Sequence, residues 1–454
     1  MEQAARKLFG TDGIRGTANT YPMTAELALR VGSAVGHVCR REPGRRHRVV
    51  IGKDTRLSGY MIETALTSGI CSMGVDVLLL GPIPTPGVAF ITRDMRADAG
   101  IVISASHNPY QDNGIKIFAH DGYKLSDQQE AAIEKFVLSK DNAKTFPPAE
   151  EIGRAKRIDD AIGRYIVFCK KTFPDELTLD GMRMVIDCAN GATYRVAPTI
   201  FSELGAQVTA IHNQPDGRNI NEQCGSQYTG DLARMVKETG ADVGLAFDGD
   251  GDRLIAVDEN GCELSGDHLL ANCAKELKDQ GRLSGNRLIV TPMSNFGLRR
   301  AMQSAGIACE DAGVGDRLVL ELMRKRGATL GGEQSGHIIF KEHHTTGDGI
   351  ISALQVLSIM VRSKKKLSEL AEIFTRAPQK LINVDVKDKP PLESLPELQQ
   401  AIADAEKKLT DKGRVLVRYS GTQLMCRVMV ESDDQALTER IAAKLAGTVQ
   451  TLLG

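Results

Sequence analysis

The segment Arg183-Met-Val-Ile-Asp187 is a short run of apolar and β-branched residues that ends in a polar turn and leads towards a helical pattern. Two other segments, Arg48-Val-Val-Ile-Gly-Lys-Asp54 and Arg287-Leu-Ile-Val-Thr-Pro292, have the same form. A buried strand followed by a helix is the repeating unit of a largely parallel sheet. The three segments therefore predict an α/β fold that is used three times along the chain.

The pattern changes after about residue 376. The predicted elements are a strand at 380–386, a helix at 395–408, strands at 414–419 and 427–431, and a helix at 435–453. This β-α-β-β-α order over about eighty residues predicts a small α+β domain with an antiparallel sheet. The predicted domains are 1–158, 159–258, 259–376 and 377–454.

The composition excludes several classes of function. With 454 residues the chain is too long for a single hydrophobic core. A net charge of −1 and an aromatic content of 4% predict no nucleic-acid partner. No apolar run is long enough for a membrane span, so no membrane partner is predicted. The nine cysteines are scattered singly, which predicts neither a zinc site nor disulfides and favours the reducing cytoplasm.

The acidic segment Asp248-Gly-Asp-Gly-Asp-Arg253 is the strongest local motif. Glycines permit a tight loop that points three carboxylates at one place, where a hard divalent cation prefers oxygen ligands. An EF-hand also spaces acidic residues in this way, but its sixth position requires glycine and here holds Arg253. A solvated acidic turn is the alternative, although three unpaired carboxylates would repel one another. The motif predicts a metal site at Asp248, Asp250 and Asp252.

The segment Ile103-Ser-Ala-Ser-His-Asn-Pro109 follows a predicted strand at 99–103. A serine at the end of a strand is a candidate nucleophile or phosphoryl carrier, and Lys116 follows ten residues after Ser106. The chain has no G-x-S-x-G motif, which disfavours a serine hydrolase. A strand-to-turn junction with capping hydroxyls is an equally good interpretation of this motif alone.

Two further segments carry groups suited to a sugar phosphate. In Gly331-Gly-Glu-Gln-Ser-Gly-His337, the side chains of Glu333, Ser335 and His337 are suited to bond sugar hydroxyls or an amino group, although a structural histidine is the alternative. In Arg418-Tyr-Ser-Gly-Thr422, with Arg427 beyond it, arginines flank two hydroxyls and a glycine. Such a set suits a phosphate, while a plain hairpin turn remains open.

In this order, the motifs resemble those of the α-D-phosphohexomutase superfamily. Phe9-Gly-Thr-Asp-Gly-Ile-Arg-Gly16 is similar to the family's opening, and the resemblance extends from residue 8 to about 431. Gln334 in the sugar loop resembles the members that act on glucosamine phosphates. One departure is Gln423-Leu424, where the family usually has Glu, often followed by Pro.

The resemblance implies four domains around a central cleft: three α/β domains with mixed, largely parallel sheets and one α+β domain. It implies a bacterial enzyme that interconverts glucosamine 6-phosphate and α-D-glucosamine 1-phosphate through a phosphoserine and a 1,6-bisphosphate, towards UDP-N-acetylglucosamine and peptidoglycan. It also implies one Mg²⁺ per subunit, glucosamine or glucose 1,6-bisphosphate as activator, and a homodimer. A phosphomannomutase or phosphoglucomutase is the nearest alternative; a metal-dependent phosphatase and a non-catalytic sugar-phosphate sensor are more distant ones.

The resemblance also implies roles for individual residues. Ser106 would carry the phosphoryl group and, with Asp248, Asp250 and Asp252, hold the metal. Proton transfer would fall to Lys116, with His337 second. The remaining predicted contacts are Arg15 and Arg253 to the transferring phosphoryl, His107 to the serine loop, Glu333, Ser335 and His337 to the sugar, and Arg418, Ser420, Gly421, Thr422 and Arg427 to the substrate's own phosphate.

Overall fold

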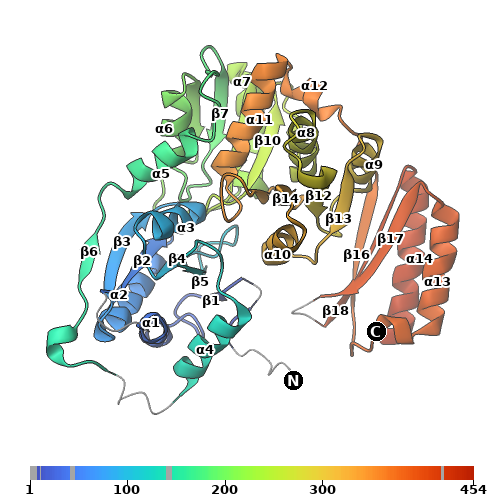
Figure 1. Ribbon diagram of the computed structural model, residues 1–454. Coiled ribbons are helices and arrows are strands. Elements are labelled where there is room, and N and C mark those ends of the chain that lie inside the picture. The colour runs from blue at the N-terminus through green and yellow to red at the C-terminus, as the bar shows by residue number, and fades with distance from the viewer. Residues whose placement is uncertain (1–7, 11, 41–45, 140–145, 421–423) are drawn as a thin grey trace.

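The computed structural model describes residues 8–10, 12–40, 46–139, 146–420 and 424–454. In these residues the strands form four sheets. The four parts of the chain follow one another along an arc, from the N-terminal part in blue to the C-terminal part in red (Figure 1). Among the helices that are described, none combines the length and the apolar character needed to span a bilayer.

The first sheet has the strand order β1-β5-β4-β2-β3-β6. Its strands are β1 (Ile14–Thr17), β2 (Arg48–Lys53), β3 (Asp76–Pro82), β4 (Ala99–Ile103), β5 (Asp112–Ala119) and β6 (Ala155–Arg157). Its helices are α1 (Ala25–Cys39), α2 (Ser58–Ser72), α3 (Thr85–Asp94) and α4 (Asp127–Leu138). Strand β2 runs parallel to both β3 and β4, whereas β5 is antiparallel to its neighbours. Helices α1 and α2 pack so closely at Gly69 that a Cβ there would lie 2.1 Å from the Leu29 carbonyl oxygen.

The second sheet has the order β11-β10-β9-β7-β8. Its strands are β7 (Arg183–Asp187), β8 (Gln207–Ile211), β9 (Val243–Phe247), β10 (Leu254–Asp258) and β11 (Glu263–Leu264). Its helices are α5 (Ala161–Lys170), α6 (Val196–Glu203) and α7 (Gly230–Thr239). Strands β9 and β10 form an antiparallel pair, so the acidic loop between them is flanked by strands. The pairing of β11 with β10 continues this sheet to Leu264.

The third sheet has the order β13-β12-β14-β15. Its strands are β12 (Arg287–Val290), β13 (Ala308–Asp311), β14 (Leu330–Gly332) and β15 (Ile338–Phe340). Its helices are α8 (Gly266–Asp279), α9 (Phe296–Ser304), α10 (Asp316–Arg326), α11 (Gly349–Ser363) and α12 (Leu367–Ala371). Strand β12 runs parallel to β13 and β14, and β15 is antiparallel. The three predicted strand–helix segments thus lie in three mixed, largely parallel sheets, which confirms that part of the fold.

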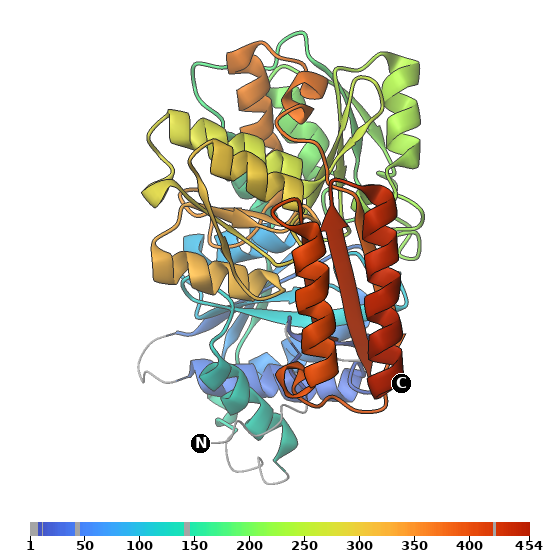
Figure 2. The ribbon, with the colours of Figure 1, turned by 90° about the vertical axis from the view of Figure 1, so that its right-hand side faces the viewer.

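The C-terminal part has the predicted order β-α-β-β-α. Its elements are β16 (Gln379–Asp385), α13 (Pro396–Leu409), β17 (Gly413–Tyr419), β18 (Met425–Ser432) and α14 (Gln435–Leu453). The strands pair antiparallel in the order β16-β18-β17. Both helices cover the same face of this sheet, as the view along the C-terminal side shows (Figure 2).

The distribution of buried apolar side chains separates the last part from the rest. One continuous hydrophobic cluster runs through the first three parts, from Val50 to Phe374. The C-terminal part has its own cluster, from Val384 to Leu453. Across this junction Asn295 Nδ2 donates to Glu431 Oε1 at 3.0 Å. A unit with its own core and polar contacts to its neighbour can move as a body more readily than one that shares a core.

Candidate active site

The serine loop follows β4 and is held by buried polar contacts. The Ser106 backbone has a φ of +53°, which is uncommon for a residue other than glycine. The Ser106 N–H donates to Ser104 Oγ at 2.9 Å, and that hydroxyl donates to Asp54 Oδ2 at 2.6 Å. The fully buried Arg56 donates to the Ser106 carbonyl at 2.9 Å. These contacts fix the conformation that directs the Ser106 side chain.

A second support for this loop comes from the second sheet's connections. Asn221 Nδ2 donates to the carbonyl oxygens of Ser106 and Asn108 at 2.9 Å and 3.0 Å. Gly249, in the acidic loop, approaches so closely that a Cβ there would lie 2.7 Å from the Ser106 carbonyl oxygen. The serine loop and the acidic loop therefore pack directly against each other.

The structure places Ser106 next to the acidic loop. Ser106 Oγ donates to Asp248 Oδ2 at 2.6 Å, although 142 positions separate the two residues. Asp248, Asp250 and Asp252 are all buried, and one oxygen from each lies within 4.8 Å of the other two. Asp250 Oδ1 and Asp252 Oδ1 have no hydrogen-bond partner. A buried set of carboxylate oxygens with unused acceptors fits a hard divalent cation.

Lys116 lies beside the same carboxylates. Its Nζ is 2.9 Å from Asp250 Oδ2, 3.3 Å from Asp12 Oδ2 and 3.9 Å from Asp252 Oδ2. Burial would lower the pKa of Lys116, but the carboxylates of Asp12 and Asp250 outweigh it and raise that pKa. For Asp248, burial first and then the charges of Asp252 and Asp250 raise the pKa well above its usual range. The site therefore carries a fixed ammonium among carboxylates that repel one another.

His337 also faces the acidic loop. Its Nδ1 lies 3.5 Å from Asp252 Oδ2, and its Nε2 lies 3.8 Å from Asp316 Oδ2. Burial alone would lower the pKa of His337, but the charge of Asp252 and its hydrogen bond, then the charge of Asp316, raise it to about 9. Asp316 in turn bonds Lys124, which also bonds Asp12. This chain of charges joins the first and third parts behind the site.

Arg253, Arg15 and His107, which were predicted to contact the phosphoryl group or the serine loop, all lie close to other predicted site residues or to Asp12. Arg253 Nε lies 3.9 Å from Asp252 Oδ1 and has no hydrogen-bond partner. Arg15 on β1 bonds Asp12, and its Nε is also without a partner. His107 Nδ1 lies 3.3 Å from Ser106 Oγ. Burial, then the charges of Arg253 and Arg15, lower the pKa of His107 to about 4, so this imidazole is neutral.

The sugar-loop residues lie next to a cavity of about 260 Å³ that Gln334 and Ser335 line. Glu333 Oε1 accepts from the Gly315 N–H at 3.1 Å, and Glu333 Oε2 accepts from Ser335 Oγ at 3.2 Å. Met293 on the third part lines the same cavity. The C-terminal part lines this cavity through Gln379, and Arg418 Nη2 lies 3.8 Å from Sδ of the cavity-lining Met293.

Two of the residues predicted to bind phosphate in the C-terminal part are neighbouring arginines. Arg418 on β17 lies opposite Arg427 on β18, and the Nε atoms of both are buried without a hydrogen-bond partner. Burial and then the charge of Arg427 lower the pKa of Arg418. Ser420 is buried, and its carbonyl accepts from Lys389 Nζ at 2.7 Å. Gly421 and Thr422 lie outside the described residues.

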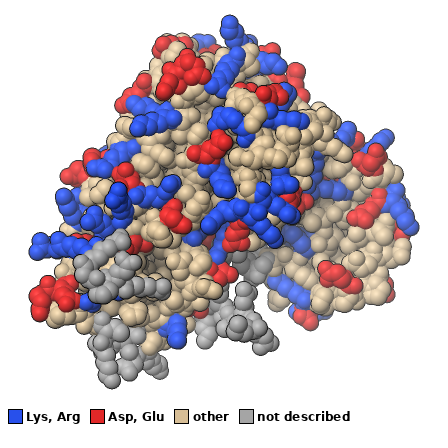
Figure 3. Space-filling view, in the orientation of Figure 1, with Lys and Arg blue, Asp and Glu red and all other residues tan. Residues whose placement is uncertain are grey.

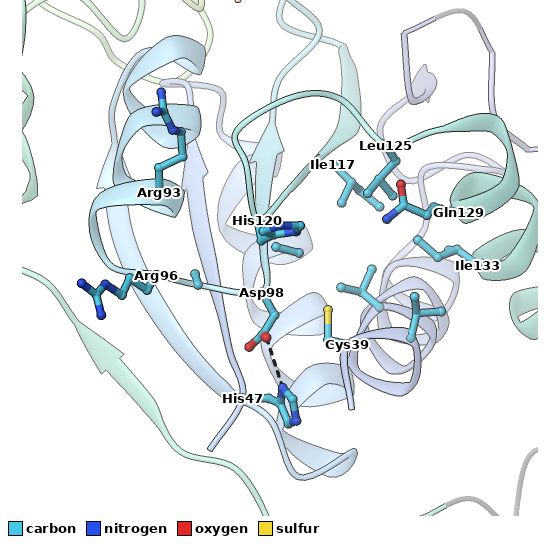
Figure 4. A pocket seen from close by; sticks show the side chains of 14 residues that line it. Cys39, His47, Arg93, Arg96, Asp98, Ile117, His120, Leu125, Gln129 and Ile133 are labelled. Carbon is cyan, nitrogen blue, oxygen red and sulfur yellow. Dashed lines mark ion pairs between the residues drawn. The ribbon is translucent and has the colours of Figure 1, made fainter. Parts of the chain in front are cut away.

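Two views show how charge and space are distributed around this site. Basic side chains gather near the centre of the face shown in Figure 3, where the parts of the chain meet. A separate cavity of about 520 Å³ lies in the first part, and Figure 4 shows His47, Arg96, Asp98 and His120 around it. The predicted site residues do not line this cavity.

Comparison with known proteins shows the family to which the chain belongs. Models of phosphoglucomutase/phosphomannomutase α/β/α domains I, II and III match residues 6–144, 164–261 and 265–377, and the C-terminal domain model matches 381–448. The phosphoglucosamine mutase of Syntrophobacter fumaroxidans is 58% identical over 98% of this chain and 99% of its own. The chain belongs to the phosphoglucosamine mutase family of the phosphohexomutases. The phosphoglucosamine mutase of Syntrophus aciditrophicus is also 58% identical, over 99% of this chain and 100% of its own.

Solved structures share the fold. A phosphoglucomutase/phosphomannomutase family protein from Burkholderia thailandensis matches with a TM-score of 0.81 and 25% identity, over 98% of this chain and 97% of its own. The N-acetylphosphoglucosamine mutase of Aspergillus fumigatus, solved with GlcNAc-6P and magnesium, matches with a TM-score of 0.68 and 17% identity, over 98% of this chain and 96% of its own. The second likeness concerns the fold alone.

Several residues that complete the site were not among the predicted ones. Thr85 donates to Asp250 Oδ2 at 2.7 Å, and Asn221 supports the serine loop as described. Lys389 bonds the phosphate loop. Asp12 stands inside the family-like segment Phe9–Gly16, so a signal for it was present in the sequence. Thr85 and Lys389 lie in no recognisable motif and reach the site only through the fold.

Proposed function

We propose that this enzyme interconverts glucosamine 6-phosphate and α-D-glucosamine 1-phosphate, with Ser106 as the carrier of the phosphoryl group. The observation that carries this proposal is the 2.6 Å hydrogen bond from Ser106 Oγ into the buried carboxylate loop. The substrate is supported by relatives that are 54–58% identical over nearly the whole chain and are named phosphoglucosamine mutases.

We propose that Ser106, Asp248, Asp250 and Asp252 hold one Mg²⁺. When bound, this cation offsets negative charge on the phosphoryl group in transfer. The protein's own part is to place the Ser106 oxygen at the metal loop and to prevent the serine loop from shifting. Arg56 and Asn221 do this through the Ser106 carbonyl.

The reaction needs two phosphoryl transfers, one from Ser106 to the sugar and one from the sugar back to Ser106. In the first, a free sugar oxygen attacks the phosphorus on Ser106, the bond from phosphorus to Oγ breaks, and the proton of the sugar hydroxyl passes through an acid–base group to Oγ. The sugar is then a 1,6-bisphosphate. After it turns end for end, Ser106 Oγ attacks its other phosphorus, the bond from that phosphorus to the second sugar oxygen breaks, and the proton of Oγ passes through the acid–base group to that oxygen. Phosphoserine is restored and no phosphate is consumed.

We assign the proton transfer at the sugar oxygen to Lys116, with His337 second. Both face Asp252, and the carboxylates around them favour their charged forms. Each is therefore poised to donate a proton to the departing oxygen and to place positive charge beside the transferring group, and each accepts the proton of the attacking hydroxyl once it has given up its own. Arg15 and Arg253, each with a buried Nε that lacks a partner, would bind oxygens of the transferring phosphoryl. The neutral imidazole of His107 would support Ser106.

The opposite end of the substrate would be held by two loops. Glu333, Ser335 and His337 would contact the sugar and its amino group. Arg418, Ser420, Gly421, Thr422 and Arg427 would hold the phosphate that is not reacting. Two neighbouring arginines, each with a buried Nε that lacks a partner, favour an anion between them. The separate core of the C-terminal part supports closure on the substrate, which would exclude water from the phosphoserine.

The remaining parts of the proposal concern the chain as a whole. We propose four domains with boundaries near residues 158, 258 and 376; the four sheets support this division, although β11 carries the second sheet to Leu264. We also propose a cytoplasmic homodimer, and glucosamine or glucose 1,6-bisphosphate as the activator that restores a lost phosphoserine. Light scattering in solution tests the dimer, and activity with and without bisphosphate tests the activator.

A comparison of substrates tests the proposed activity. The enzyme, with Mg²⁺ and bisphosphate, is assayed on glucosamine 6-phosphate, glucose 6-phosphate and mannose 6-phosphate. A charged amino group that bonds Glu333 is worth about 1.5–3 kcal/mol, so kcat/KM for the amino sugar should be about 10- to 150-fold higher. Glu333→Gln should shrink this ratio. Equal kcat/KM values would point to a phosphoglucomutase or phosphomannomutase, and stoichiometric release of phosphate to a phosphatase.

A further inference from the structure

A second group of metal-ligating side chains lies on the second sheet, outside the acidic loop. Asp187 is the last residue of β7, and His212 follows the last residue of β8 directly. These strands are parallel neighbours, so their carboxyl ends meet at one edge of the sheet. One ligand atom each from Asp187, His212 and Cys224 lies within 4.8 Å of the other two.

The three side chains offer one oxygen, one nitrogen and one sulfur to the same point. Asp187 and Cys224 are buried, whereas the His212 side chain is 25% exposed and leaves a path to solvent. Asp187 Oδ2 lies 3.1 Å from His212 Nδ1, yet that nitrogen is buried without a properly oriented hydrogen bond. His212 Nδ1 therefore faces the Asp187 carboxylate without donating to it, and its lone pair can serve as a ligand when the imidazole is neutral.

The outer contacts orient two of these groups. His212 Nε2 faces Asp231 Oδ2 at 3.5 Å, and a carboxylate that accepts from Nε2–H leaves the Nδ1 lone pair free for a cation. The backbone N–H groups of Ala189 and Gly225 each donate to Asp187 at 2.8 Å, which fixes the carboxylate. An imidazole between a ligand site and a second carboxylate is a common arrangement around zinc.

We propose that Asp187, His212 and Cys224 bind a divalent transition-metal ion of the Zn²⁺ class, with a water molecule as fourth ligand. A thiolate and an imidazole favour Zn²⁺ over Mg²⁺, whereas the all-oxygen loop of Asp248 favours Mg²⁺. Binding breaks the S–H bond of Cys224, forms a bond from sulfur to the metal and releases one proton to solvent. The site is thus chemically distinct from the magnesium site.

Such a cation would act on the serine loop through a short segment of chain. Asn221 stands three residues before Cys224, and its side chain holds the carbonyl of Ser106. Its own N–H donates to the Ala189 carbonyl at 2.9 Å. A cation that ties Cys224 to the ends of β7 and β8 would restrict this segment. Occupancy should therefore raise the midpoint of thermal unfolding.

Cobalt titration of the full-length enzyme tests this site. The metal-free protein is first saturated with Mg²⁺ and then titrated with Co²⁺, which gives a thiolate-to-cobalt charge-transfer band only where sulfur is a ligand. We expect one equivalent of Co²⁺ per chain with this band, and displacement by Zn²⁺. Asp231→Asn should weaken binding about 10- to 100-fold. Cys262→Ser, which alters an exposed cysteine between β10 and β11 of the same sheet, should bind as the unaltered enzyme does.

Cys224→Ser is the decisive variant. The proposal requires that the charge-transfer band disappears in this variant while its thermal unfolding without Co²⁺ stays close to that of the unaltered enzyme. A band that persists in Cys224→Ser, or no band in the unaltered enzyme at one equivalent of Co²⁺, overturns it. If Cys224→Ser does not fold, His212→Gln at the more exposed ligand serves the same purpose, and unchanged cobalt affinity in that variant overturns it equally.

Discussion

Replacing Arg418 with alanine should change substrate affinity and protein stability in opposite directions. Arg418 lies directly opposite Arg427 across β17 and β18, and both Nε atoms are buried without a partner. Two like charges in that position destabilise a sheet by about 0.2–1 kcal/mol. In the absence of substrate, Arg418→Ala should therefore leave the free energy of unfolding unchanged or raise it by up to about 1 kcal/mol.

The effect on substrate binding should be much larger. A hydrogen bond between a charged donor and a phosphate contributes about 1.5–3 kcal/mol, which corresponds to about 10- to 150-fold in affinity. Because the proposed contact is to the phosphate that does not react, most of this loss should fall on KM. Arg418→Lys keeps the charge but lacks the planar set of donors of a guanidinium group. Its KM should therefore lie between that of the unaltered enzyme and that of Arg418→Ala.

Steady-state kinetics and urea unfolding of the same preparations measure both effects. Arg440→Ala removes an equal charge from an exposed position on α14 and should leave KM unchanged. A value of KM for Arg418→Ala within twofold of that of the unaltered enzyme would refute the anchor. A loss of more than about 1 kcal/mol in unfolding free energy would show instead that Arg418 has a structural role.

Two other substitutions test the metal loop and the support of the serine loop. Asp250→Asn removes a carboxylate that Lys116 and Thr85 both bond, and kcat should fall at least about 100-fold and lose its dependence on Mg²⁺ concentration; retained turnover with Mg²⁺ dependence would contradict this. Arg56→Met leaves the buried Asp54 carboxylate unpaired and should cost about 3–5 kcal/mol in urea unfolding, whereas an unchanged midpoint would show that the buried ion pair is not needed.

Local sequence patterns predicted much of the fold because buried strands and amphipathic helices leave short-range signals. The helix predicted at 435–453 is α14, and the strand predicted at 99–103 is β4. The strand predicted at 427–431 is longer in the structure, because the pairing of β18 with both neighbours begins at Met425. Short motifs do not reveal where hydrogen bonding between strands begins.

The site was predictable only in part, for a physical reason. Three aspartates on one loop predict a cation site by themselves, but nothing local to Ser106 places it beside Asp248; the resemblance alone implied that. The group of Asp187, His212 and Cys224 left no signal, because its members come from separate strand ends and the cysteines appear isolated along the chain. Contacts of this kind arise from the order of strands in a sheet rather than from spacing.

Mapping of the phosphorylated residue tests the central claim most directly. The enzyme is incubated with Mg²⁺ and the sugar 1,6-bisphosphate, digested, and analysed by mass spectrometry before and after addition of glucosamine 6-phosphate. One phosphoryl group on Ser106, which passes to the added sugar, is the predicted result, and Ser106→Ala should carry none and show no mutase activity. A fully active enzyme without phosphate on Ser106, or an active Ser106→Ala variant, would contradict the account.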